Sequence, residues 1–106
     1  MSAFCMVVTK CGSETEAKQI ATAAVDRRQA AAAHCHGPVS SGYRWKGKIE
    51  EVREWECVLK TTRRRFERLE SFIRECHSYE TPCVLAMPIE AGSQPYLRWL
   101  EEQVSE

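Results

Sequence analysis

Cys76 and His77 are adjacent, and they are the most direct sign of chemistry in this 106-residue sequence. A thiolate is a soft ligand that suits Cu(I), whereas an imidazole suits Cu(II), zinc or nickel. Adjacent residues at the end of a helix can converge on one ion only if the helix breaks between them, which the following Ser78 permits. The alternative is structural: Cys76 closes the buried stripe of a helix, and His77 interacts with the last carbonyl groups of that helix.

His34, Cys35 and His36 form a second group of candidate ligands. On a strand, His34 and His36 share one face and Cys35 takes the other. Two imidazoles at this spacing can hold one metal ion, and a threefold axis would multiply them, but they do not complete a tetrahedral site by themselves. The alternative is a polar strand edge beside the bend at Gly37-Pro38.

The composition argues against several other classes of function. Fifteen basic residues balance fifteen acidic ones, so broad electrostatic capture of nucleic acid is not expected. No apolar run is long enough for a membrane span, and no P-loop or nucleophile motif indicates an enzyme. The six cysteines are scattered, and no basic segment of the kind that begins a signal peptide precedes the first apolar stretch. We therefore expect reduced thiols in a cytoplasmic protein.

The elements that position these residues are expected within a single domain over residues 1–106. Phe4 to Thr9 is short and apolar, which predicts a buried strand. Ser13 and Glu16 fit a capping box, and apolar residues recur at helical spacing over residues 14–28. A strand is expected from about Ala31 to Trp45, with an irregularity at Gly37-Pro38.

The second half of the chain continues this alternation. A tight turn at Lys46-Gly47-Lys48 leads into a long strand, Ile49 to Thr61, so residues 39–61 form an extended hairpin. A second amphipathic helix is expected over residues 63–76, then a strand from Cys83 to Met87 and a short final helix that starts near Pro95.

This order predicts an α+β, ferredoxin-like βαββαβ sandwich with a C-terminal helix. Right-handed crossovers place both main helices on one face of a four-stranded antiparallel sheet and leave the other face bare. An apolar sheet face does not usually stay in water, so we expect an oligomer that covers it.

The sequence resembles the CutA family of divalent-cation tolerance proteins. The resemblance runs in order from about Val7 to Leu100. It is carried by five stretches: Tyr43–Glu51, Leu59–Thr62, His77–Pro82, Leu85–Gly92 and Tyr96–Leu100.

The resemblance implies a homotrimer with a subunit similar to PII signalling proteins, in which the long hairpins pair across subunits. It also implies tolerance of divalent metals, with copper bound by some members, and no established enzymatic reaction. A cleft between subunits is suggested as well. It would be lined by Tyr43, Arg44, Trp45, Lys60, Glu80 and Glu90. The carboxylates there could hold hard cations or orient a small ligand, or they could belong to an intersubunit ion-pair network.

Three positions depart from the family pattern. Thr9 stands where some bacterial members have a proposed metal-binding cysteine, and Ser78 replaces the usual proline of a His-Pro-Tyr loop. The second strand reads Ala32-Ala33-His34-Cys35 instead of a sequence close to Cys-Val-Asn-Ile. Where the family has a proposed copper-ligand pair of adjacent histidines, this chain offers Cys76 and His77.

Overall fold

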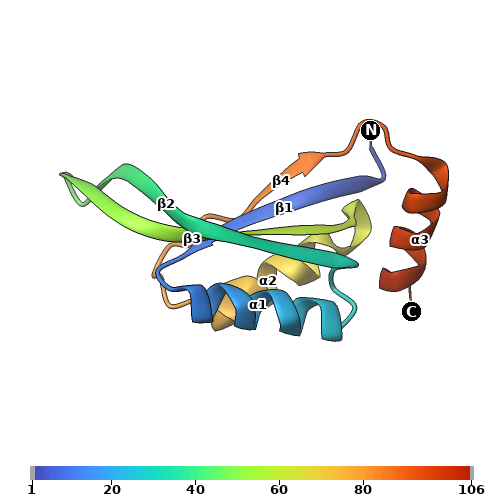
Figure 1. Cartoon of the computed structure of the whole chain (residues 1–106), viewed down its shortest axis with the longest axis horizontal. Coiled ribbons are helices and arrows are strands. Elements are labelled where there is room, and N and C mark those ends of the chain that lie inside the picture. Colours follow the sequence, from blue (N-terminus) through green and yellow to red (C-terminus); the bar gives the residue numbers. More distant parts are fainter. Residues whose placement is uncertain (1, 106) are drawn as a thin grey trace.

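Two helices cover one side of a four-stranded antiparallel sheet in the computed structural model, which describes residues 2–105 (Figure 1). In chain order the elements are β1 (Phe4–Cys11), α1 (Glu14–Asp26), β2 (Ala32–Trp45), β3 (Lys48–Thr62), a 3-10 turn (Arg63–Arg65), α2 (Phe66–Cys76), β4 (Leu85–Pro88) and α3 (Gln94–Val104). The strands are arranged in the order β2-β3-β1-β4. The predicted α+β, ferredoxin-like βαββαβ fold with a C-terminal helix is therefore confirmed.

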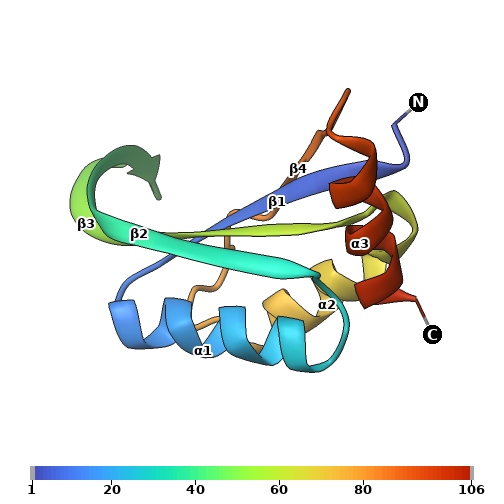
Figure 2. The ribbon, with the colours of Figure 1, turned by 45° about the vertical axis from the view of Figure 1, so that its right-hand side comes forward.

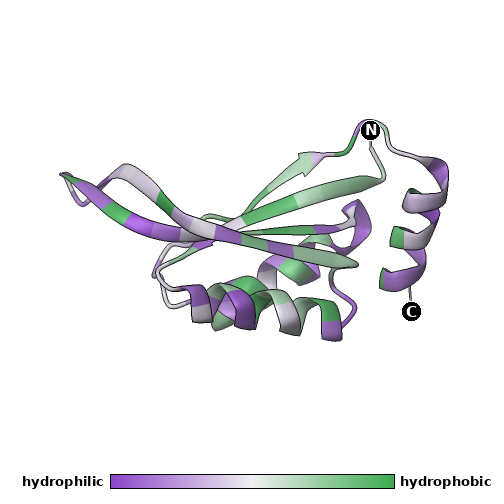
Figure 3. Ribbon diagram, in the orientation of Figure 1, coloured by the Kyte–Doolittle hydropathy of each residue, from purple (hydrophilic) through white to green (hydrophobic). Residues whose placement is uncertain are grey.

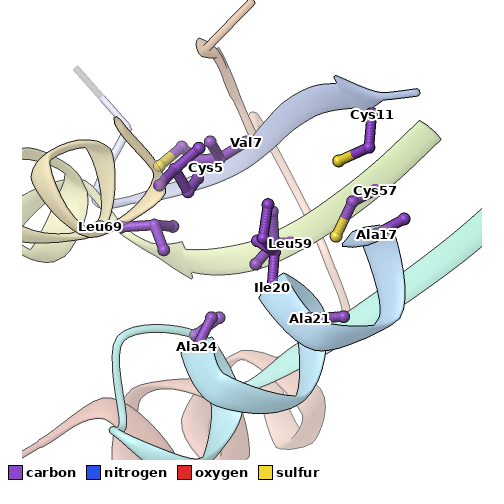
Figure 4. Packing of buried hydrophobic residues seen from close by; sticks show 12 residues of the cluster. Cys5, Val7, Cys11, Ala17, Ile20, Ala21, Ala24, Cys57, Leu59 and Leu69 are labelled. Carbon is purple, nitrogen blue, oxygen red and sulfur yellow. The ribbon is translucent and has the colours of Figure 1, made fainter. Parts of the chain in front are cut away.

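The core lies between this sheet and the first two helices. Every second residue of β1 from Cys5 to Cys11 faces the helices, and β3 adds Cys57 and Leu59, because paired residues of antiparallel strands share a face. The helices contribute small and branched apolar side chains. The resulting cluster includes Ala17, Ile20, Ala24, Leu69 and Ile73 (Figure 4). Figure 3 shows the same pattern as hydrophobic stretches along β1 and α1.

The opposite face of the sheet is only partly covered, by α3. Leu100 and Val104 of this helix form a small buried cluster with Ala31, and Phe4 packs against it. This differs from the expectation of a fully bare face, because the last helix returns to the sheet instead of continuing away from it. Beyond α3 the face stays open: Leu85 and Met87 of β4 are 62% and 47% exposed.

The β2–β3 hairpin projects well beyond the helices, and its outer end curves round (Figure 2). Its strands pair from Ala32 opposite Lys60 to Trp45 opposite Lys48, with the predicted irregularity between His36 and Val39. Gly37 lies there against the Trp55 ring, where a Cβ atom would come within 2.5 Å of a ring carbon. Gly47 takes a positive φ of 83° at the predicted turn, a conformation that glycine adopts without steric cost.

Several element boundaries differ from the sequence prediction, and β1, for example, extends to Cys11 instead of ending at Thr9. The first helix ends at Asp26 instead of 28, because Arg28 adopts a φ of 57° and the Gln29 N–H bonds to the Ala24 carbonyl. The second helix begins with a 3-10 turn before α2. The last strand covers Leu85–Pro88 instead of 83–87, because these four residues are the ones that pair with β1.

Candidate functional site

His77 follows α2 directly and packs under the end of β1, with none of its side chain exposed. Its Nδ1 accepts a hydrogen bond from the Tyr79 N–H at 3.1 Å, so in the neutral ring Nε2 carries the proton. Nε2 donates this proton to the Lys10 carbonyl oxygen at 2.8 Å. Both ring nitrogens are thus engaged with backbone groups, but these belong to β1 and to the following loop, and not to the last carbonyls of α2 that the structural alternative had named.

Cys76 is exposed and uses its thiol differently from its neighbour. Its Sγ donates to the Phe72 carbonyl at 3.0 Å, one turn back along α2. Partial burial raises the pKa of this thiol, which disfavours the thiolate that a metal would require. A shared Cys76–His77 metal site stays a prediction, and it would require His77 to give up one of its backbone hydrogen bonds.

The loop after His77 is tied to the start of α1. Ser13 caps that helix by accepting from the Glu16 N–H at 3.1 Å, which is one half of the predicted capping box. The Glu16 carboxylate accepts from the Ser78 N–H at 2.7 Å and from its hydroxyl at 3.0 Å. A proline at position 78 has no N–H, so this departure from the family pattern supplies a donor that the usual residue lacks.

His34 and His36 lie on the same face of β2, opposite to the face that carries Cys35, as their spacing predicts, and both are exposed. His36 Nε2 is 3.5 Å from a Glu56 oxygen, and the Lys10 ammonium is 3.5 Å from the other oxygen. Within residues 2–105, no three His, Cys, Asp or Glu side chains come together as a metal site. The histidine pair would need ligands from outside the chain to complete one.

A cavity of about 740 Å³ lies between the inner side of the hairpin and the loop 79–83. Three of the residues predicted for a cleft line it: Tyr43, Trp45 and Glu80. The other three do not. Lys60 instead lies beside α3, with its Nζ 3.3 Å from the Tyr96 hydroxyl. Glu90 is exposed and follows β4, and Arg44 is exposed on the hairpin.

Sequence analysis missed the two polar groups at the inner wall of this cavity, Glu54 and Tyr79. Glu54 is only 4% exposed, and its carboxylate accepts a hydrogen bond from the Tyr79 hydroxyl at 2.7 Å. The alternating pattern of β3 places Glu54 on the same face as the charged Glu56, so the sequence carries no signal of its burial. The loop after α2 brings the Tyr79 hydroxyl to it from 25 positions away in sequence.

Tyr79 is expected to make folding sensitive to alkaline pH. Burial, the hydrogen bond to Glu54 and the charge of that carboxylate raise the pKa of Tyr79 well above its ordinary range. A raised pKa means that the folded protein holds this proton more tightly than the unfolded chain does. Its contribution to stability is therefore complete below about pH 10 and is lost as the pH rises further.

The check is a phenolate absorbance titration of the wild type minus that of Tyr79→Phe. The Tyr79 signal should appear only well above pH 10 in buffer and near pH 10 in denaturant. Glu54→Gln should move it to lower pH. Equal curves in buffer and in denaturant would contradict the prediction.

No helix among residues 2–105 has the length and apolar character needed to cross a membrane.

Comparison with known proteins places these features in a family. The family described as CutA1 divalent ion tolerance protein matches residues 5–103. Protein CutA of Mus musculus is 43% identical over 92 residues, which cover 87% of this chain and 52% of that protein. The divalent-cation tolerance protein CutA of Thermus thermophilus is 36% identical over 97 residues, covering 92% and 94%. The chain spans about half the length of the mammalian relatives it matches.

Solved structures agree with the sequence comparison. The Thermus thermophilus divalent cation tolerance protein superimposes with a TM-score of 0.93 at 34% identity, over 96% of this chain and 99% of that one. CutA1 from Oryza sativa gives a TM-score of 0.95 at 26% identity, over 99% and 96%. The sequence match and the shared fold lead to one conclusion: the chain belongs to the CutA1 family of divalent ion tolerance proteins.

Proposed function

We propose that this protein works as a homotrimer in divalent-metal tolerance, by binding the cation itself, with copper as the first candidate. The observation that carries the metal role is the match to relatives named divalent-cation tolerance proteins at 36% identity. No catalytic reaction is part of the proposal. We place the protein in the cytoplasm, where its six free thiols would stay reduced, although a relative from Archaeoglobus fulgidus is described as periplasmic.

The case for assembly is physical. Leu85 and Met87 on the open sheet face, and Ile49 near the hairpin turn, are between 47% and 64% exposed. Apolar side chains gathered on one face and one projecting hairpin are typical of a surface that a second copy covers. A PII-like trimer with hairpins paired across subunits would bury both regions and would extend the cavity wall to a neighbouring chain.

The exposed pair His34 and His36 is the better candidate for the cation, because its imidazoles are accessible and Glu56 lies beside His36. Imidazole suits Cu(II) and zinc. Assembly around a threefold axis would supply the ligands that one chain lacks. Cys76 and His77 form the second candidate pair, at the cost of the His77 hydrogen bonds.

The proposal predicts that Cu²⁺ binds the trimer and that histidine replacement removes it. In isothermal titration, His34→Ala/His36→Ala should lower the affinity for Cu²⁺ at least tenfold, while Cys76→Ser should leave it unchanged. Sedimentation should give a trimer for the wild type and a smaller species for Met87→Glu. Absence of Cu²⁺ and Zn²⁺ binding in the wild type would refute the metal role, and a monomer at micromolar concentration would refute the assembly.

A second function, a PII-like signalling or scaffold trimer that holds a small ligand or a partner segment, is favoured by the cavity. Its walls combine aromatic rings of Tyr43, Trp45 and Tyr79 with the buried carboxylate of Glu54. Ligand sites typically have this apolar lining with a few placed polar groups. A thermal-shift screen of nucleotides and metabolites tests it, and silence across a broad panel would remove its support.

A further inference from the structure

Two cysteines lie directly opposite each other in the middle of the sheet. Cys35 of β2 is the register partner of Cys57 of β3, and both are free thiols. Their side chains point to the helix-covered face, since Cys57 is fully buried in the core cluster and Cys35 packs against it. The pair is therefore inside one subunit and does not depend on assembly.

The two sulfur atoms are close enough to affect each other. Burial raises the pKa of Cys57 far above its usual range, and the neighbouring sulfur of Cys35 raises it further, because it disfavours a second negative charge and favours the protonated Cys57 thiol. Cys11 points to the same side of the sheet as Cys57 (Figure 4), but its sulfur lies 3.8 Å from His77 Nε2. The Cys35–Cys57 pair thus stands out as two thiols on directly opposite positions of neighbouring strands that share the helix-covered face of the sheet.

Opposite residues of antiparallel strands have Cβ atoms about 4.5–5.5 Å apart. A disulfide requires about 3.5–4.5 Å, so a direct S–S bond would draw the strands together. An ion between the sulfur atoms lengthens the connection and suits the native register better. Two thiolates are also a complete ligand set for a soft ion that prefers a linear arrangement.

The charge balance selects the kind of ion. Each thiol releases its proton to solvent when the metal–sulfur bond forms. Two thiolates with a monovalent ion leave one negative charge in the core, which is costly to bury, whereas two thiolates with a divalent ion leave none. We propose that Cys35 and Cys57 form a two-coordinate site for a soft divalent cation, with Hg²⁺ as the probe. This inference rests on the proposed function, because it adds a site for the same class of cation.

Access to the pair is from the edge of the sheet. β2 is an edge strand, and Cys35 is only half-buried, so an ion can meet Cys35 first and then Cys57. Two other thiols have different partners: Cys5 pairs with Thr61 across the sheet, and Cys76 bonds to a backbone carbonyl.

The test loads the reduced full-length chain with one equivalent of Hg²⁺ and then adds excess glutathione. Retained mercury is counted by native mass spectrometry, and X-ray absorption reports its ligands. Wild type and the control Cys76→Ser/Cys83→Ser should each retain one ion bound by two sulfur atoms. Cys35→Ala and Cys57→Ala should retain at least tenfold less. Should Cys57→Ala fail to fold, the half-buried Cys35→Ala decides alone.

Equal retention by Cys35→Ala, or loss of the ion from the Cys76→Ser/Cys83→Ser control, would overturn the inference. Titration of the same proteins with Cu²⁺ separates it from the proposed function. If the wild type binds Cu²⁺ but loses Hg²⁺ to glutathione, the Cys35–Cys57 site is refuted and the proposed metal-binding role is supported. If the protein retains Hg²⁺ through Cys35 but does not bind Cu²⁺ or Zn²⁺, the Cys35–Cys57 site is supported and the proposed histidine site is refuted.

Discussion

Replacing His77 with alanine is expected to lower the free energy of unfolding by about 2–5 kcal/mol. The change leaves the Lys10 carbonyl and the Tyr79 N–H without their partner. A buried polar group that loses its hydrogen bond costs about 1–3 kcal/mol, and the missing ring also leaves a cavity. The measurement is urea unfolding at fixed protein concentration, with and without Cu²⁺.

The matched control is His34→Ala, which removes the same side chain from an exposed strand position. In the absence of Cu²⁺, it should change stability by no more than about 0.5 kcal/mol. If His77→Ala were as stable as this control and yet no longer bound Cu²⁺, the main role of the His77 imidazole would be to bind metal and not to stabilise the fold. That result would reverse the assignment that the hydrogen bonds support.

Replacing Leu59 with alanine is expected to cost about 2–5 kcal/mol as well, for a different reason. Leu59 is fully buried near the C-terminal end of β3, where it pairs with Val7 of β1 and packs in the core beneath the sheet. Its truncation loses apolar burial and leaves a void that close-packed neighbours fill only partly. Thermal and urea unfolding should both report the loss, with an unchanged dependence on urea concentration if only stability is affected.

Val25→Ala is the control for this substitution, since Val25 lies on the outer side of α1 and is 39% exposed. Alanine also has the higher helix propensity, so the two effects oppose each other and the net change should be small. A similar loss in both variants would mean that the core is not centred on β3.

Much of the fold could be predicted because its signals are local. The local signals are the short apolar run of β1, the helical spacing after Ser13 and the glycine at position 47, each of which involves a few consecutive residues. The boundaries that differ depend on longer contacts. The start of β4 at Leu85 is fixed by its pairing with Val8, which lies far away in sequence.

The candidate site was harder to predict for the same reason. Tyr43, Trp45 and Glu80 line a cavity within the single chain, and the predicted cleft between subunits stays a prediction. Glu54 and Tyr79 are 25 residues apart in sequence and meet only in the folded chain. The adjacency of Cys76 and His77 suggested a joint role, whereas the end of α2 sends one side chain along the helix and the other under β1. Sequence neighbours at a helix end do not share surroundings.

The projecting hairpin gives each newly made chain a temporary hazard. Tyr43, Trp45 and Ile49, all at least 39% exposed, lie near its end, far from the core that its own chain supplies. A single chain therefore presents apolar side chains and unpaired strand edges to other proteins nearby. If the proposed trimer forms, rapid encounter with identical chains would cover this arm and reduce mistaken association during synthesis, and that encounter would depend on the concentration of the protein.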